Sequence, residues 1–144
     1  MKQIDLGLSG LTAPAIGLGC VKLADVTPQA ALNLIKTSLE LGVNFFDHAD
    51  IYTRGESETR FGEALALSAI RREDMIIQSK TGNRRGWYDF SKEHIITSAE
   101  NSLRKMKTDY LDILLLHRPD TLVEPEEVAE AFDQLHQAGK VRQF

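Results

Sequence analysis

The sequence predicts an α/β protein in which parallel strands alternate with helices. A short apolar run, a loop and a segment with apolar residues at helical spacing follow one another four times. Successive apolar runs lie about 30 residues apart, the size of one strand–helix–strand unit. The opening segment, residues 3–14, alternates around a glycine-bounded turn at residues 7–10, which predicts a short hairpin. Strict alternation implies parallel strands joined by right-handed crossovers.

After the hairpin, the apolar runs are the predicted strands. They cover residues 15–19, 43–46, 75–79 and 111–116, and residues 141–144 begin a further extended run. The order is therefore a hairpin, four strand–helix units and the start of a fifth strand.

Four helices are predicted between these strands from capping residues and apolar faces. Threonine or serine can cap a helix, proline fits its first position and glycine ends it. The boundary residues, in chain order, are Thr27 and Pro28, Gly42, Ser57, Ser91, Pro125 and Gly139.

Composition restricts the class of protein. The 144 residues are enough for one domain, 1–144, with a real core, and their net charge of −4 provides no basic footprint for nucleic acid. A basic–aromatic loop (Arg84, Arg85, Trp87 and Tyr88) is a weak RNA signal, and a solvated loop is favoured.

No apolar run approaches the roughly 20 residues of a membrane helix, and the N-terminus lacks a signal-peptide pattern. The single cysteine, Cys20, excludes an internal disulfide and is expected to be a buried small hydrophobe. We therefore expect a cytoplasmic protein.

Two architectures fit the alternating pattern: an open doubly wound sheet and part of an eight-unit barrel. A dinucleotide-binding open sheet normally carries a glycine fingerprint after its first strand. Only Gly17 and Gly19 are present here, and they lead into a loop rather than directly into a helix. A barrel needs roughly 250 residues, and this chain has a little over half of that.

Four chemically active side chains lie at or just after predicted strand ends: Asp47, Tyr52, Lys80 and His117. The carboxyl ends of parallel strands converge on one face, so these side chains should meet there. A phenol, an ammonium, a carboxylate and an imidazole together can donate a proton. Taken singly, each residue has an ordinary structural explanation, such as a loop cap or a solvated lysine. A metal site that adds His48 and Asp50 matches no common zinc spacing.

Seven stretches then identify a resemblance. They are residues 44–52 (NFFDHADIY), 55–58 (GESE), 78–80 (QSK), 102–103 (SL), 108–112 (TDYLD), 114–120 (LLLHRPD) and 139–142 (GKVR). In these motifs, which run through essentially the whole chain, the sequence resembles the aldo–keto reductases, in particular bacterial members with short loops.

The resemblance implies the N-terminal half of a (β/α)8 TIM barrel, preceded by a β-hairpin that plugs the barrel floor. It implies reduction of aldehydes or ketones with NADPH. Asp47, Tyr52, Lys80 and His117 correspond to the catalytic tetrad. The loop Cys20, Val21 and Lys22, with Asp47, would lie beside the cofactor's nicotinamide ribose. The chain stops before the family's Ser-Asn element that holds the nicotinamide amide.

Carbonyl reduction needs a hydride at carbon and a proton at oxygen. A phenol is a weak acid, and an ammonium within about 4–6 Å makes it a stronger one. Tyr52 is thus the expected proton donor, Lys80 its activator and Asp47 the partner that holds Lys80. His117 is expected to donate a hydrogen bond to the carbonyl oxygen. The hydride must come from the cofactor.

Alternatives remain at this stage. The chain could be a non-catalytic binding or regulatory module, or an inactive truncated product. The exposed sheet edges of a half-barrel invite self-association or pairing with the missing C-terminal half. Trp87 and Tyr88 either wall a substrate pocket or pack on the surface. The physiological substrate and the preference for NADPH over NADH are open.

Overall fold

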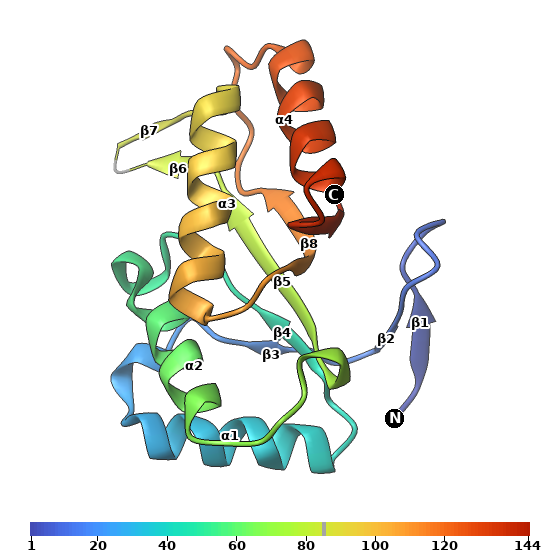
Figure 1. Ribbon diagram of the computed structural model, residues 1–144, viewed down its shortest axis with the longest axis vertical. Coiled ribbons are helices and arrows are strands. Elements are labelled where there is room, and N and C mark those ends of the chain that lie inside the picture. Colours follow the sequence, from blue (N-terminus) through green and yellow to red (C-terminus); the bar gives the residue numbers. More distant parts are fainter. Residues whose placement is uncertain (85) are drawn as a thin grey trace.

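A five-stranded parallel sheet forms the centre of the computed structural model (Figure 1). The strands, in spatial order, are β3 (Leu18–Gly19), β4 (Phe45–Asp47), β5 (Ile76–Thr81), β8 (Leu111–Leu116) and β9 (Val141–Gln143). All neighbouring pairs are parallel, which confirms the predicted α/β class. The structure describes residues 1–84 and 86–144. Arg85 of the basic–aromatic loop lies outside the described residues.

Within the described residues, four helices connect these strands. They are α1 (Pro28–Glu40), α2 (Glu56–Ala66), α3 (Lys92–Met106) and α4 (Pro125–Gln137). Two predicted caps are confirmed, because Thr27 accepts a hydrogen bond from the Ala30 N–H and Ser91 accepts one from the His94 N–H. Each bond satisfies a backbone donor that the first helical turn would otherwise leave free.

The predicted cap of α2 is wrong. The helix begins at Glu56 after Gly55, whose φ of +89° suits a residue without a side chain. Ser57 lies inside the first turn, and its hydroxyl donates to the carbonyl oxygen of Val21 at 3.2 Å. Ser57 therefore ties α2 to the loop after β3 instead of capping the helix.

Short elements complete the chain. The predicted opening hairpin is present as β1 (Gln3–Asp5) and β2 (Thr12–Pro14). A second hairpin, β6 (Asn83–Arg84) and β7 (Trp87–Tyr88), was expected only as a long loop. Three 3₁₀ turns are η1 (Leu23–Asp25), η2 (Tyr52–Gly55) and η3 (Arg72–Asp74). Among the described helices, none is long and apolar enough to cross a membrane.

The two faces of the sheet are covered differently. The helices cover one face and bury the larger apolar cluster, in which Phe46, Ile77, Phe61 and Leu114 are almost fully enclosed. The opening hairpin lies on the other face, where Ala13 packs with Ile76 and Ile113 (Figure 1). A hollow of about 210 Å³ on that face reaches from Leu6 to Gln78 and Phe144. The outer strands of the described sheet are β3 and β9.

Helices α2 and α3 approach each other closely at Gly62. A Cβ atom at this position would lie 2.2 Å from the Lys105 carbonyl oxygen and 2.9 Å from the carbonyl carbon of Met106. Only a residue without a side chain permits this separation, so Gly62 sets the distance between the two helices.

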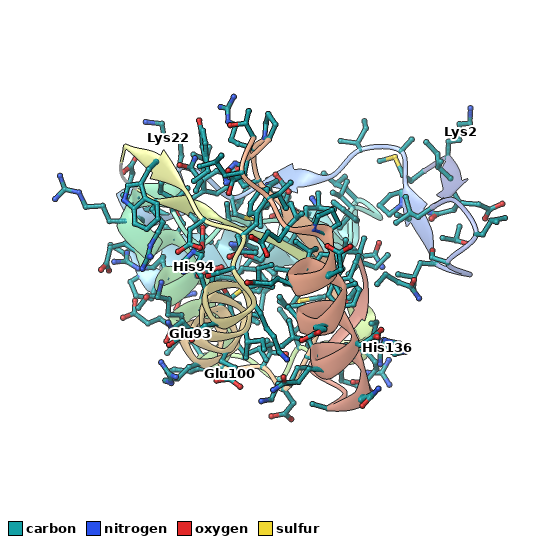
Figure 2. All side chains as sticks on the ribbon, turned by 90° about the horizontal axis from the view of Figure 1, so that it is seen from above. Lys2, Lys22, Glu93, His94, Glu100 and His136 are labelled. Atoms are coloured by element: carbon teal, nitrogen blue, oxygen red, sulfur yellow. The ribbon has the colours of Figure 1, made fainter. Side chains whose placement is uncertain are left out.

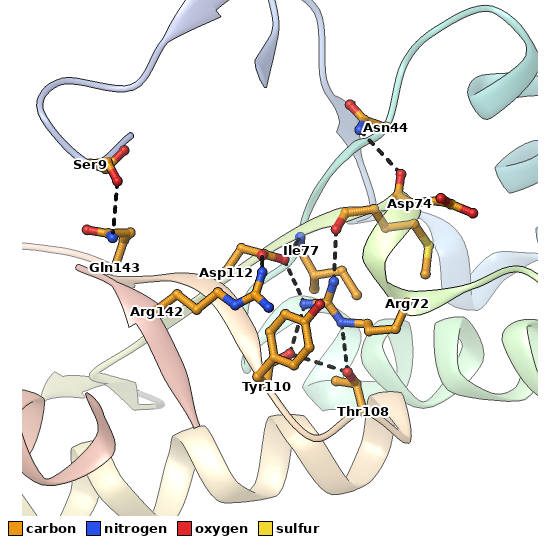
Figure 3. A network of polar contacts seen from close by, with 11 residues as sticks. Ser9, Asn44, Arg72, Asp74, Ile77, Thr108, Tyr110, Asp112, Arg142 and Gln143 are labelled. Carbon is orange, nitrogen blue, oxygen red and sulfur yellow. Dashed lines mark hydrogen bonds and ion pairs between the residues drawn. The ribbon is translucent and has the colours of Figure 1, made fainter. Parts of the chain in front are cut away.

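A buried ion-pair network ties β8 to its neighbours near the amino ends of the strands (Figure 3). Asp112, only 2% exposed, accepts hydrogen bonds from Arg72 at 2.7 Å, Arg142 at 3.1 Å and the Ile77 N–H at 2.9 Å. The two guanidinium groups lie 3.9 and 3.8 Å from the Tyr110 ring centroid. We call these four side chains, Arg72, Tyr110, Asp112 and Arg142, the amino-edge network.

Candidate active site

Lys80 is the centre of the polar cluster at the carboxyl ends of the strands. Its Nζ donates to Asp47 Oδ1 at 2.6 Å, to the His48 carbonyl oxygen at 2.8 Å and to Tyr52 Oη at 3.0 Å. An ammonium has three hydrogens and a neutral amine only two, so three acceptors match the charged form. Lys80 was predicted to close its strand. It lies one residue before the end of β5.

Tyr52 receives the Lys80 hydrogen bond on its oxygen. Because the ammonium is the donor, the phenolic hydrogen stays available for another acceptor. Tyr52 opens the η2 turn after β4, and its backbone N–H is held by the Ala49 carbonyl oxygen at 3.1 Å. The phenol is thus placed from both ends, through its backbone and through its oxygen.

His117 stands beside Tyr52. The two rings meet edge to face, with centroids 5.9 Å apart and an interplanar angle of 80°. The backbone N–H of His117 donates to the Thr81 carbonyl oxygen, which fixes the residue just after β8. The pKa of His117 lies below its usual value because of burial first and the nearby Lys80 ammonium second. The ring is therefore biased toward the neutral form.

Asp47 holds Lys80 through one oxygen only. Oδ1 accepts from Lys80 and also from the Gln78 side-chain amide. Every hydrogen bond that the described residues make to this carboxylate ends on Oδ1, and the side chain is 28% exposed. Oδ2 therefore stays accessible to a ligand hydroxyl.

Gln78 was not predicted to belong to the site. It lies two residues before Lys80, and side chains two apart on a strand share a face. The spacing of two residues from Lys80 could have indicated from the sequence that Gln78 faces the site. Gln78 also lines the hollow on the inner face of the sheet, so it connects the cluster with that hollow.

The predicted cofactor loop follows β3 and lies against the site. The Cys20 N–H donates to the Asp47 carbonyl oxygen at 2.9 Å. The Val21 carbonyl oxygen accepts from the hydroxyls of Thr53 at 3.0 Å and Ser57 at 3.2 Å. This loop is thus attached to the strand that carries Asp47 and to the turn that carries Tyr52.

The three side chains of this loop differ in access. Cys20 is 1% exposed, and burial raises the pKa of its thiol to about 12, so it is the buried small hydrophobe that was expected. The Val21 side chain is exposed. The Lys22 ammonium lies 3.7 Å from Asp25 at the periphery of the molecule (Figure 2).

Two polar residues next to Asp47 point away from the Lys80 cluster. His48 is fully buried and meets the Phe61 ring edge to face, with centroids 4.5 Å apart. Burial lowers the pKa of His48 to about 3. Asp50 accepts a hydrogen bond from the Ser98 hydroxyl of α3 at 2.6 Å.

A strained turn follows Tyr52. Thr53, Arg54 and Gly55 all have positive φ angles, of 48°, 61° and 89°. Such conformations cost about 1–2 kcal/mol each for residues other than glycine. Strain of this kind is characteristic of functional sites. The turn places Thr53 on the cofactor loop and directs the chain into α2.

Trp87 and Tyr88 lie on the exposed hairpin strand β7. The Arg84 guanidinium lies 4.7 Å from the Trp87 ring centroid, and it pairs with Asp89 at 2.7 Å. Both aromatic side chains are accessible, and the described residues place neither of them in contact with the Lys80 cluster.

The arrangement is suited to delivering a proton. A phenol with a free hydrogen, an ammonium on its oxygen and an adjacent imidazole form one accessible group of donors. A carbonyl oxygen near Tyr52 and His117 would meet hydrogen-bond donors where negative charge develops during reduction.

Comparison with known proteins identifies the family. The model of the Aldo/keto reductase family matches residues 15–144. The oxidoreductase YdhF of Escherichia coli is 46% identical over the whole chain, which spans 52% of that relative. A 6-dehydroglucose reductase of Novosphingobium aromaticivorans is 38% identical over 96% of the chain and 48% of its own length.

A solved structure gives the same result for the fold. The holo form of an aldo-keto reductase from Bacillus halodurans superposes with a TM-score of 0.87 at 37% identity, over 99% of this chain and 48% of that one. The chain spans about half the length of the relatives it matches, and its sheet corresponds to half of their barrel. This chain belongs to the aldo/keto reductase family.

Proposed function

We propose that the chain carries the proton-donating residues of an NADPH-dependent reductase that converts aldehydes or ketones to alcohols, with Tyr52 as the proton donor. One observation carries the proposal. Lys80 donates to Tyr52 Oη while its other hydrogens are held by Asp47 and the His48 carbonyl oxygen. The positive charge is thereby fixed beside the phenol, where it stabilises the phenolate that remains after proton transfer.

The other residues have complementary roles. Asp47 keeps the ammonium charged and in place, because a partly buried cation needs a carboxylate partner. His117 donates a hydrogen bond to the carbonyl oxygen and orients it toward Tyr52. The carbonyl oxygen takes the phenolic proton as its carbon is reduced. The name of one relative, a 6-dehydroglucose reductase, supports reduction of a carbonyl compound.

The donor set fits a nicotinamide cofactor on two counts. Asp47 Oδ2 is accessible and can accept from a ribose hydroxyl. The loop from Cys20 to Lys22 lies against Asp47 and contributes backbone and the exposed Val21, whereas the enclosed Cys20 thiol contributes packing only. When bound, NADPH would supply the hydride, which no side chain can provide. Cofactor preference and substrate choice belong to the whole protein.

The test is Tyr52→Phe in the protein expressed from its complete natural reading frame. Loss of the phenolic hydroxyl should lower kcat of carbonyl reduction by about 10²–10⁴-fold. Cofactor affinity, followed by quenching or enhancement of NADPH fluorescence, should change little.

Tyr88→Phe is the matched control, because this exposed tyrosine lies on the β7 hairpin strand. Turnover by Tyr52→Phe equal to that of Tyr88→Phe would rule out Tyr52 as the donor.

A further inference from the structure

Glu58, in the first turn of α2, is a buried carboxylate that the proposed proton transfer does not use. Its side chain is 0% exposed, and its Oε1 accepts a hydrogen bond from the Ser79 hydroxyl at 2.7 Å. Its Oε2 lies 3.6 Å from the Lys105 ammonium of α3. Burial raises the pKa of this carboxyl group, and the Ser79 and Ser102 hydroxyls and the Lys105 ammonium oppose the rise. A buried carboxylate is costly without such partners, so its contacts define its place in the fold.

The hydrogen bond from Ser79 reaches the sheet directly behind the reactive lysine. Ser79 and Lys80 are consecutive in β5, and the side chains of consecutive strand residues point to opposite faces. Lys80 faces Tyr52 on one side of the sheet. Ser79 faces the helices on the other side and meets Glu58 there. This bond therefore ties the first turn of α2 to the strand that carries Lys80.

The first turn of α2 also follows the proton donor closely in sequence. Tyr52 opens the η2 turn, which ends at Gly55 and passes directly into α2. Two hydrogen bonds thus join the same two segments of the chain. The Lys80–Tyr52 bond does so on the inner face of the sheet, and the bond to Glu58 does so on the helical face. Together with the intervening backbone they close a ring, so the distance between ammonium and phenol depends on both.

Lys105 extends this link to the strained turn. A Cβ atom at Gly55 would clash with the Lys105 amine, so the amine occupies the space beside the Gly55 backbone that a side chain would otherwise fill. Gly55 is the last of the three residues with positive φ that follow Tyr52. A strained turn persists only where the surrounding structure holds it. Glu58 contributes to this support, because it pairs with the same amine.

We propose that Glu58, bonded to Ser79 and paired with Lys105, is a positioning residue for the proton donor. It holds the turn that carries Tyr52 against the strand that carries Lys80, and thereby keeps the ammonium within hydrogen-bond distance of the phenol. It acts through the backbone and not by contact with the reacting atoms. The proposal rests on the proposed function only for the use that is made of the phenolic proton.

The experiment measures the ionisation midpoint of the Tyr52 phenol by NMR. It uses the protein expressed from its complete natural reading frame, with tyrosine ¹³C-labelled at the phenolic carbon, and the Tyr52 signal is the one that Tyr52→Phe lacks. Ser79→Ala cuts the tie between strand and helix without any change of charge. The midpoint should then rise by roughly 0.5–1 pH unit, because a phenolate farther from the ammonium loses part of its electrostatic stabilisation.

Glu58→Gln tests the carboxylate itself and separates position from charge. Loss of a negative charge near the phenol would by itself favour the phenolate and lower the midpoint. Loss of position raises it, so a raised midpoint identifies the positional effect. Two matched controls should leave the midpoint unchanged. They are Glu63→Gln, at a half-exposed carboxylate of the same helix, and Ser38→Ala, at a buried serine of α1 whose hydroxyl donates within its own helix.

Ser79→Ala in a Lys80→Met background tests the route of the effect. With the ammonium gone the midpoint is already raised, and the serine change should add nothing to it. A rise of equal size in both backgrounds would overturn the proposal, because the serine would then act on the phenol independently of Lys80. An unchanged or lowered midpoint in Ser79→Ala or in Glu58→Gln would overturn it as well.

Ser79→Ala keeps the proposal testable if Glu58→Gln does not fold, since it removes only one buried hydroxyl. Failure of the proposed function is distinguishable, because undiminished turnover by Tyr52→Phe leaves these titrations as they are.

Discussion

Both edges of the sheet hold ion pairs, but the carboxylates of the two edges differ in exposure and in how many of their oxygens are bonded. In the amino-edge network, both oxygens of Asp112 are occupied, and the arginines also stack on Tyr110. At the carboxyl edge, Lys80 is saturated while Asp47 Oδ2 and the Tyr52 hydrogen stay available. Where every hydrogen-bonding atom of an ion pair has a protein partner, the pair holds the strands in place. Where some of these atoms have no protein partner, as with Asp47 Oδ2 and the Tyr52 hydrogen, they can bind a ligand.

The distribution of strain supports this distinction. Two of the three non-glycine residues with positive φ in the described chain, Thr53 and Arg54, directly follow Tyr52. We infer that the amino edge mainly stabilises the fold. The carboxyl edge contains strained residues that lower stability, and this is the edge at which parallel α/β proteins carry their active sites.

The largest effect expected from this comparison is on catalysis. In the complete protein, Lys80→Met should lower kcat of carbonyl reduction by about 10²–10⁴-fold, because the charge beside the phenol is lost. The fold should survive, since Asp47 keeps Gln78 and solvent as partners. Steady-state kinetics and thermal unfolding measure both properties. Equal kinetics for Lys80→Met and Lys36→Met, a change at an exposed lysine of α1, would contradict the prediction.

Asp112→Asn should lower stability and leave turnover unchanged, the opposite of Lys80→Met. Removing this charge leaves the mostly buried Arg72 without its carboxylate partner, which costs about 1–3 kcal/mol in free energy of unfolding; Arg142, which is half exposed, contributes little to this loss. Molecules that remain folded should keep their turnover, because the amino-edge network lies away from Tyr52. Denaturant unfolding and kcat per folded molecule are the measurements. Asp109→Asn, at an exposed neighbouring carboxylate, should have little effect on either.

The buried His48 should lower the stability of the protein in acid. The pKa of His48 is about 3 in the folded chain and about 6.5 when unfolded, so only the unfolded state takes up a proton between these values. Stability should therefore fall as the pH drops from about 6.5 toward 3. In His48→Leu this component is absent, and the urea midpoint should fall less between pH 7.5 and pH 5 than in the wild type.

The difference between His48→Leu and the wild type in the pH dependence of unfolding reports the contribution of the His48 imidazole alone. Asp50 and Glu58 have raised pKa values because of burial, and they contribute equally to both chains. Parallel stability curves for His48→Leu and the wild type would show that the imidazole takes up its proton without unfolding.

The smallest expected effect comes from relieving backbone strain. Arg54→Gly should raise the free energy of unfolding by about 0.5–1 kcal/mol, because glycine adopts a φ of 61° without steric cost. Lys107→Gly, at the left-handed cap of α3, should give a similar gain. Only Arg54→Gly should also lower kcat, since it loosens the turn that places Tyr52. Identical kinetics for the two variants would mean that this turn has no part in placing the phenol.

The fold was largely predictable from the sequence because its signals are local. Thr27, Pro28, Ser91 and Pro125 mark helix starts through the chemistry of the first turn, and the structure has helices beginning there. Clustering of Asp47, Tyr52, Lys80 and His117 followed from the convergence of parallel strands. Their assignment as the catalytic tetrad came from the family resemblance and stays a prediction.

The features that were missed depend on distant contacts or unusual backbone. Asp50 meets Ser98 across 48 residues, and no local pattern announces such a pair. The left-handed Thr53 and Arg54 contradict the ordinary preference of their residue types. Serine is a common helix cap, but the helix begins at Glu56 after the left-handed Gly55, so Ser57 lies inside the first turn and its hydroxyl donates to the Val21 carbonyl oxygen.

Gly62 affects how this chain can diverge. It lies well outside the group of reactive side chains, yet any larger residue there would act as a wedge between two helices. One helix follows the turn that bears the phenol, and the other carries the serine that restrains Asp50. A single added methyl group would thus disturb the alignment of the reactive edge from a distance, so sequence drift at position 62 is restricted by geometry alone.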